Sequence, residues 1–277
     1  MVELLSPVGD FDCLKAAVQN GANAVYFGGQ LFNARYSARN FDKDGIREAV
    51  NYAKSRNVKI NFTLNILLKN NEFDDAIDVV KYIYELGVDA VIVDDLGFAK
   101  YIIDNFPGME VHGSTQMTIH NLEGAIALKN LGYSRVVLAR ESTLSDIDYI
   151  CRNANIDIEA FVHGALCISY SGQCLFSSAI GGRSGNRGRC AQPCRMYYNM
   201  LETSDNVSYK NIGKGFLISP RDLCGLDFIP DLIKAGVKSF KLEGRMKTPE
   251  YVATVTRIYR KYIDLALSDN DYIVDKN

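Results

Sequence analysis

Short runs of apolar residues alternate with longer amphipathic segments along nearly the whole chain. The short runs are rich in Val, Ile, Phe and Leu, and the longer segments place apolar residues at helical spacing, as in "FDDAIDVVKYIYELGV". This pattern is typical of repeated strand–helix units and a parallel sheet. Eight strands are predicted, over residues 2–7, 23–29, 59–66, 89–95, 110–115, 135–141, 158–164 and 239–245.

The joints between these units are alike. "NGANAV", "LGVDAV", "LGYSRV" and "AGVKSF" each join the end of a helix to the start of a strand through a glycine. Eight such units in 277 residues predict a (β/α)₈ barrel. A doubly wound open sheet is the alternative, but "GGQLFNARYSARN" after the second strand lacks the G-x-G-x-x-G pattern of dinucleotide-binding sheets.

The interval between the seventh and eighth strands breaks this rhythm. About sixty residues separate "IEAFVHG" from the next helical segment, "LDFIPDLIKAG", and a strand–helix loop needs only a few. We therefore expect residues 1–277 to form one barrel domain with a cysteine-rich insertion at 164–225. In a barrel this insertion lies at the C-terminal face, where active sites are built.

Composition and charge agree with a globular domain. The chain is 47% hydrophobic and 23% charged, which suffices for a substantial core. The opening "MVELLSPVGD" has neither the basic start nor the apolar run of a signal peptide or membrane helix. We expect a cytoplasmic protein without a membrane partner.

Polar residues follow the predicted strand ends, where a barrel gathers them into one pocket. We take the histidines, an acid and an arginine of this ring as candidate catalytic groups: His112, His163, Glu243 and Arg245. We take further rim residues as candidate substrate-binding groups: Arg35, Arg39, Asn61, Gln116 and Arg140. The arginines suit an anionic carboxylate or phosphate.

The predicted insertion holds five of the seven cysteines, and four of them follow the pattern C-x6-C-x15-C-x3-C: Cys167, Cys174, Cys190 and Cys194. Disulfides are not expected in a reducing compartment. Structural zinc favours two tight C-x₂₋₄-C pairs, and only the second pair fits. An iron–sulfur cluster tolerates wider, uneven spacing and is favoured. Cys13 and Cys151 lie on apolar helix faces and read as packed residues, whereas Cys224 is either packed or a reserve ligand.

The same region is locally cationic although the whole chain carries a net charge of −2. No Asp or Glu occurs from Ala160 to Leu201, whereas arginines and aromatic residues do. This mixture suits phosphate neutralisation and base stacking by an RNA-binding surface. The arginines expected to contact substrate phosphates are Arg183, Arg187 and Arg189.

Several segments together resemble the collagenase-like peptidase family U32. "EAFVHGALCISYSGQCLFSS" is similar to its signature, and "NRGRCAQPCRMYY", "ISPRDLCGLDFIPDLIKAGVKSFKLEGRMKTPEYVATV" and "ELLSPVGDFDCLKAAVQNGANAVYFGG" to its flanking blocks. The resemblance spans nearly the whole chain. It implies a (β/α)₈ barrel and a four-iron four-sulfur (4Fe-4S) cluster held by Cys167, Cys174, Cys190 and Cys194.

The family resemblance also implies an activity. "GRCAQPCR" and "KLEGRMK" are most similar to the branch that makes 5-hydroxyuridine at the tRNA wobble position with prephenate. We therefore expect tRNA as substrate, prephenate as possible co-substrate and possibly a paralogous partner subunit. Two alternatives stay open: a U32-type peptidase acting on collagen-like protein, and a non-catalytic scaffold whose metal holds the loop. The chain has only three histidines, with no H-E-x-x-H and no G-x-S-x-G motif.

Overall fold

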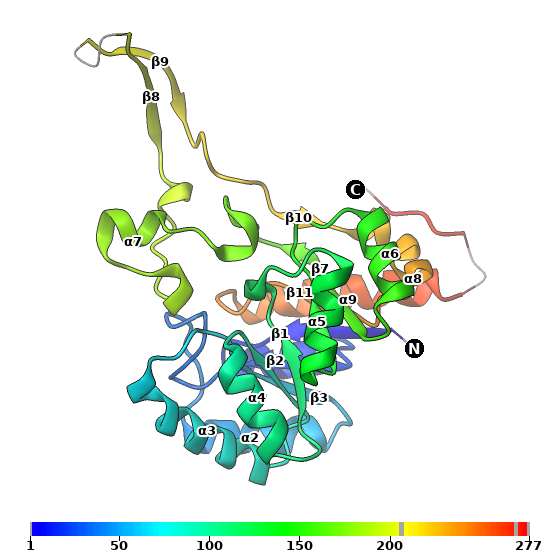
Figure 1. Cartoon of the computed structure of the whole chain (residues 1–277). Coiled ribbons are helices and arrows are strands. Elements are labelled where there is room, and N and C mark those ends of the chain that lie inside the picture. The colour runs from blue at the N-terminus through cyan, green and yellow to red at the C-terminus, as the bar shows by residue number, and fades with distance from the viewer. Residues whose placement is uncertain (1, 205–207, 269–270, 276–277) are drawn as a thin grey trace.

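The computed structural model describes residues 2–204, 208–268 and 271–275, and its body is a closed parallel barrel (Figure 1). Hydrogen-bonded neighbours run in the order β7, β11, β1, β2, β3, β4, β5, β6, and β6 pairs with β7 to close the ring. The predicted barrel is confirmed and the open-sheet alternative is wrong. The eight strands are β1 (Glu3–Pro7), β2 (Ala24–Phe27), β3 (Lys59–Leu64), β4 (Ala90–Val93), β5 (Glu110–Gly113), β6 (Arg135–Val137), β7 (Asp157–Gly164) and β11 (Ser239–Leu242).

Helices cover the outside of the barrel. Most begin at a side chain that accepts a hydrogen bond from a backbone N–H of the first turn, as Asp10, Asp42 and Thr143 do. Their apolar faces pack on the strands, and Phe27, Phe62 and Phe98 are fully buried there. The covering helices are α1 (Phe11–Gln19), α2 (Lys43–Lys54), α3 (Phe73–Glu85), α4 (Leu96–Asn105), α5 (Leu122–Leu131), α6 (Leu144–Asn153), α8 (Ile229–Ala235) and α9 (Pro249–Ala266).

Part of the barrel interior is charged, although barrel interiors are usually filled by branched apolar residues. Arg135 of β6 reaches Glu3 of β1 at 2.6 Å and Glu159 of β7 at 3.2 Å, and Lys241 of β11 lies 2.8 Å from Glu159. Because β1 and β6 are not neighbours in the sheet, the first contact crosses the interior. Burial would raise the pKa of Glu159, but Lys241 and Arg135 outweigh it and hold it at about 2. These buried charges are therefore mutually paired.

The chain between β7 and β11 leaves the barrel. It forms α7 (Phe176–Gly181), the antiparallel hairpin of β8 (Tyr198–Glu202) and β9 (Lys210–Gly215), and β10 (Leu223–Cys224), which lies antiparallel to β7. The hairpin projects away from the body as a narrow arm (Figure 1). Since β7 and β11 pair directly with each other, the barrel closes without strands from this segment.

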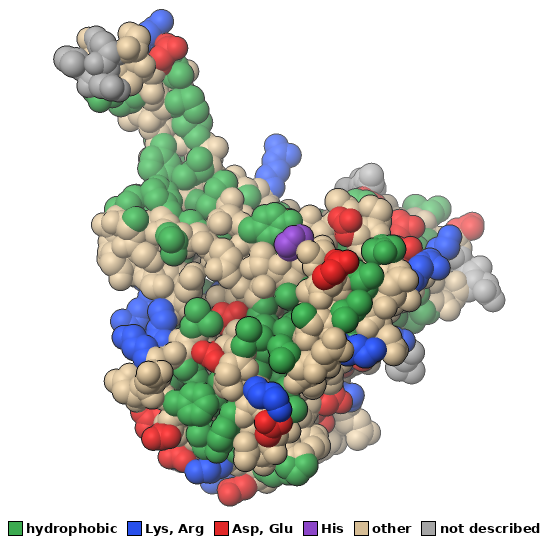
Figure 2. Space-filling view, in the orientation of Figure 1, with side chains coloured by type: hydrophobic (Ala, Val, Ile, Leu, Met, Phe, Trp, Pro, Cys, Tyr) green, Lys and Arg blue, Asp and Glu red, His purple; other side chains and the backbone are tan. Residues whose placement is uncertain are grey.

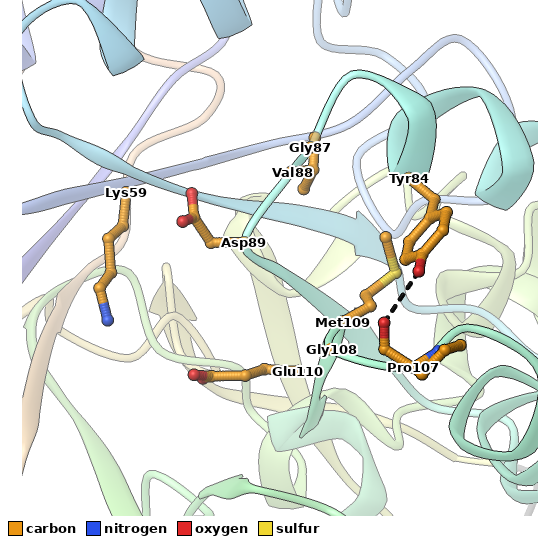
Figure 3. A pocket seen from close by; sticks show the side chains of 9 residues that line it. All are labelled: Lys59, Tyr84, Gly87, Val88, Asp89, Pro107, Gly108, Met109 and Glu110. Carbon is orange, nitrogen blue, oxygen red and sulfur yellow. Dashed lines mark hydrogen bonds between the residues drawn. The ribbon is translucent and has the colours of Figure 1, made fainter.

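The N-terminal ends of the strands form the other face of the barrel. A cavity of about 320 Å³ lies there, lined by Lys59, Asp89 and Glu110 at the starts of β3, β4 and β5 (Figure 3). The Tyr84 hydroxyl donates a hydrogen bond of 2.9 Å to the carbonyl of Pro107 across this cavity. No helix within the described residues is long and apolar enough to cross a membrane.

Candidate functional site

Glu243 is the acidic centre of the barrel mouth. It follows β11 directly, and its Oε2 accepts hydrogen bonds from Arg35 at 3.0 Å and from Arg140 at 2.7 Å. Arg35 comes from the loop after β2 and Arg140 from the loop after β6. The Glu243 carboxylate therefore links the segments that follow β2, β6 and β11. Burial would raise the pKa of Glu243, but the guanidinium groups of Arg35 and Arg140 outweigh it and hold it at about 2. The carboxylate is therefore charged at neutral pH.

Arg245 is a buried cation without a carboxylate partner among the described residues. Only 3% of it is exposed, and its guanidinium donates to the side-chain oxygens of Thr63, Asn33 and Asn40 at 2.9 to 3.2 Å. Its Nε has no hydrogen-bond acceptor, and burial lowers its pKa to about 10. The guanidinium groups of Arg35, Arg140 and Arg245 therefore exceed the single carboxylate of Glu243 by two positive charges. The arrangement is suited to a small dianion.

Gly28, which follows β2, makes room for the Arg245 guanidinium. A Cβ at this position would lie 2.6 Å from Thr63 Oγ1 and 2.9 Å from Arg245 Nη2. Both contacts are too close, so a larger residue would displace the guanidinium from its acceptors.

We predict that Gly28→Ala lowers the free energy of unfolding by about 1–3 kcal/mol, because it overpacks a closed polar site. Urea denaturation of the purified protein measures this loss. Gly213→Ala is the matched control, since a Cβ there meets no atom within 4 Å. Equal stability of the two variants would contradict the packing argument.

The four candidate cysteine ligands belong to the insertion, and the other three influence the electrostatics of Cys194. Burial raises the pKa of the Cys194 thiol, Arg195 lowers it, and Cys167, Cys190 and Cys174 raise it further. Backbone amides two residues on, at Phe176 and Gln192, each donate a hydrogen bond of 3.3 Å to the sulfurs of Cys174 and Cys190. Such N–H···S bonds stabilise thiolates and tune metal–sulfur centres.

The distances between side chains also bear on metal binding. Within the described part of the chain, no three side chains of His, Cys, Asp and Glu meet closely enough to hold one metal ion. What favours a metal group at these cysteines is the N–H···S bonds that two of them, Cys174 and Cys190, accept. Cys13 and Cys151 lie outside the insertion, and burial raises the pKa of each thiol to about 11.

The cysteine segment is fastened to the loop that carries Arg35. The amide of Tyr36 donates to the carbonyl of Gly188 at 3.2 Å, and the Arg189 guanidinium lies 4.8 Å from the centre of the Tyr36 ring. Gly188 has φ +70°, and a Cβ there would lie 2.5 Å from the carbonyl oxygen of Asn33. Arg35 therefore pairs with Glu243 while its loop contacts the cysteine segment.

The structure separates both candidate catalytic histidines from Glu243. His112 is 99% buried, and its Nε2 hydrogen-bonds Glu110 at the opposite end of the barrel. His163 turns its ring toward α9, where Nδ1 lies 3.3 Å from the Tyr259 hydroxyl. Burial lowers the pKa of both imidazoles. Neither ring hydrogen-bonds Glu243 or its arginines, and the assignment of these histidines as catalytic groups stays a prediction.

The predicted substrate-binding residues divide into three groups. Arg35 and Arg140 meet at Glu243, and Gln116 accepts a hydrogen bond of 3.3 Å from Asn65 at the same face. Asn61 lies deeper, two residues before Thr63 on β3, and its Nδ2 has no acceptor. The remaining arginines lie outside the mouth: Arg39, Arg183, Arg187 and Arg189.

These outer arginines have different partners. Arg187 donates to a Glu72 carboxylate oxygen at 2.9 Å and to the carbonyl of Leu67, so it fastens the insertion to the barrel and is not free for phosphate. Arg39 is 81% exposed and pairs with Asp10. Arg183 and Arg189 are exposed and joined, since Arg183 Nε donates to the carbonyl of Arg189 at 3.1 Å.

Sequence reasoning missed the residues that hold Arg245. Thr63 follows Asn61 by two positions, and strand alternation puts both side chains on one face. The sequence could therefore have placed Thr63 beside the candidate Asn61. Asn33 and Asn40 come from the irregular loop after β2, where no periodicity predicts direction.

The chain matches known proteins over nearly its full length. The sequence model of peptidase family U32 matches residues 9–276. The tRNA hydroxylation protein P1 of Bacillus subtilis is 39% identical over 99% of this chain and 66% of its own length. A 23S rRNA 5-hydroxycytidine synthase of Escherichia coli is 42% identical over 97% of this chain and 40% of its own length.

A collagenase of Porphyromonas gingivalis is 35% identical over 95% of this chain and 65% of its own length. The chain thus spans about two thirds or less of these three relatives. A solved structure of a U32 peptidase superposes with a TM-score of 0.58 at 12% identity, over 88% of this chain and 93% of that one, a likeness of fold alone.

Proposed function

The chain belongs to peptidase family U32, and from this premise we propose that it hydroxylates RNA with the help of an iron–sulfur cluster. The most specific reading is 5-hydroxylation of the tRNA wobble uridine. The observation that carries the proposal is the near-complete match to relatives named for RNA hydroxylation. The site supports it through a cluster of arginines around Glu243, close to the segment that carries four cysteines.

The cysteines supply the ligands in this proposal. Cys167, Cys174, Cys190 and Cys194 would hold a 4Fe-4S cluster, which supplies single-electron transfer when bound. The amides of Phe176 and Gln192 stabilise negative charge on the sulfurs. Arg195 braces the segment by donating to Ser219 Oγ at 2.8 Å and to the carbonyl of Leu166 at 3.0 Å.

The barrel mouth supplies the anion site. Prephenate carries two carboxylates, which matches the two uncompensated positive charges of Arg35, Arg140 and Arg245 around Glu243. Glu243 keeps two of these guanidinium groups in place, and Asn33, Asn40 and Thr63 direct the third. We propose that these arginines bind and orient this co-substrate.

A peptidase is less well supported by the side chains. His112 hydrogen-bonds the Glu110 carboxylate, His120 the Thr118 carbonyl and His163 the Tyr259 hydroxyl. A peptidase of the Ser–His or Cys–His kind needs a histidine within hydrogen-bond reach of its Ser or Cys side chain. The collagenase relative therefore does not change the preferred function.

The proposal predicts the loss of one hydroxylated nucleoside from tRNA when the gene is deleted. Mass spectrometry of digested tRNA from parent and deletion strains measures it, in a host with no redundant relative. Restoring the gene should restore the nucleoside, whereas protease activity of the extract should not change. Identical nucleoside profiles in the two strains would refute RNA hydroxylation and favour the peptidase.

A further inference from the structure

Gln116 is held at the barrel mouth by hydrogen bonds from both the barrel and the insertion. It lies in the short helical turn Thr115–Met117 that follows β5, and only 9% of it is exposed. Its backbone N–H donates to Ser114 Oγ at 3.2 Å, and its carbonyl accepts a hydrogen bond from the side chain of Gln173. Gln173 directly precedes Cys174 in the sequence. Gln116 therefore lies where the barrel mouth meets the cysteine segment.

A chain of hydrogen bonds fixes the direction of the Gln116 side-chain amide. The chain begins at the backbone N–H of Ala34, which can only donate and which reaches Asn65 Oδ1 at 3.0 Å. Because the Asn65 oxygen is engaged in this way, its Nδ2 faces Gln116 and donates to Oε1 at 3.3 Å. Neither amide can be turned over without the loss of a hydrogen bond. Gln116 therefore presents Nε2, a donor, at its remaining end.

The donor at this end of Gln116 lacks a partner. Within the part of the chain that the structure describes, no acceptor lies in hydrogen-bond range of its Nε2. Asn61, four positions before Asn65 and only 2% exposed, is in the same state, since its Nδ2 has no acceptor. Strand alternation turns Asn61 to the side of β3 on which Thr63 contacts Arg245. The mouth therefore offers donors that a ligand with oxygen acceptors would satisfy.

Gln116 also lies between the two parts of the candidate site. The chain of hydrogen bonds that orients it starts in the loop after β2, whose Arg35 pairs with Glu243. On the other side, the Gln116 carbonyl holds the residue before Cys174. On the face shown in Figure 2, Lys and Arg side chains gather where the insertion meets the barrel, and the phosphates of an RNA can approach there. A base bound at Gln116 would therefore lie beside both the arginines and the cysteine segment.

We propose that Gln116 selects uracil over cytosine as the base to be hydroxylated. At C4, next to the C5 carbon that the proposed reaction modifies, uracil carries a carbonyl oxygen and cytosine an amino group. Gln116 Nε2 donates to the carbonyl oxygen, whereas it would meet the amino group donor against donor and leave both unpaired. The inference rests on the proposed function and names the residue that chooses the base.

The test compares two RNA stem-loops that differ only at one unpaired loop position, which is uridine in one and cytidine in the other. Competition binding to the full chain, purified anaerobically, measures the ratio of the two affinities. The parent protein should prefer the uridine RNA by about tenfold, and Gln116→Ala should bind the two RNAs equally. Gln19→Ala, at the exposed end of α1, is the matched control and should keep the parent preference.

Two further variants should reverse the preference, because each presents an acceptor to the base in place of a donor. In Gln116→Glu, one carboxylate oxygen accepts from Asn65 and the other faces the base. In Asn65→Asp, the carboxylate accepts from the Ala34 amide and offers its second oxygen to Gln116, which then turns its own amide over. Both variants should favour the cytidine RNA, although only one of them changes Gln116. A residue with a structural role alone would weaken both RNAs alike and leave their ratio unchanged.

Thermal unfolding of each variant identifies a loss of fold, and the isosteric Asn65→Asp keeps the test decisive if Gln116→Ala unfolds. Equal affinities of the parent for the two RNAs would overturn the inference, and so would a parent preference that survives in Gln116→Ala and Asn65→Asp. RNA hydroxylation would stand in either case, since the deletion strain tests it separately. If the parent bound neither RNA at low salt and the deletion changed no nucleoside, the proposed function would fail together with the inference.

Discussion

Replacing Cys190 or Cys194 with Ser should leave the purified protein without bound iron, whereas Cys13→Ser should keep it. The first two thiols lie in the shared cysteine environment of the insertion, and the Cys190 sulfur accepts a backbone hydrogen bond. Serine removes a soft thiolate ligand that iron–sulfur centres require. Iron, acid-labile sulfide and zinc are measured together after anaerobic purification.

Two controls separate ligand loss from misfolding. Cys13 and Cys151 are packed thiols whose pKa burial raises to about 11, so serine there removes no ligand. Circular dichroism should show the same helix content in all variants, because the barrel closes without the insertion. Equal iron content in the Cys190 and Cys13 variants would refute the ligand assignment. Bound zinc without sulfide would show a zinc site in place of the proposed cluster.

Glu243→Gln should abolish the RNA modification and cost about 3–5 kcal/mol of unfolding free energy. The amide keeps the shape of the side chain but removes the carboxylate shared by Arg35 and Arg140. Three guanidinium groups would then lie at the mouth with no acid among them. Urea denaturation measures the stability loss, and nucleoside analysis of tRNA from complemented cells measures the function.

The loss should depend on pH in a defined direction. Glu243 has a pKa of about 2 in the folded protein, below the roughly 4.3 of an unfolded glutamate. Its charge therefore stabilises the fold above about pH 4, and this stabilisation disappears as pH falls toward 2. The gap between parent and Glu243→Gln should be widest at neutral pH and shrink in acid. Asp148→Asn on exposed α6 should show little loss, and a gap that is constant with pH would contradict the ion-pair explanation.

The barrel was predictable from sequence because strand and helix periodicity act locally. All eight predicted strands form, since each apolar run is bounded by polar or glycine residues and followed by a helix or the insertion. The gathering of Arg35, Arg140, Glu243 and Arg245 was also accessible, because parallel strands bring their C-terminal ends to one face.

The pairing of side chains was not predictable in the same way. Arg35 and Glu243 are 208 residues apart, and Arg187 and Glu72 are 115 apart, so no local pattern connects them. The direction of a side chain was the second obstacle. His112 and His163 occupy strands that lead to the mouth, yet one hydrogen-bonds a residue at the far end and the other packs on α9.

The direct pairing of β7 with β11 separates two events in the life of this chain. Lys241 of β11 pairs with Phe161 of β7, and no strand of the insertion lies between them. Under the proposed function, the barrel would therefore be complete before the cysteines take up the proposed cluster. The timing of maturation would then follow the supply of iron and sulfide.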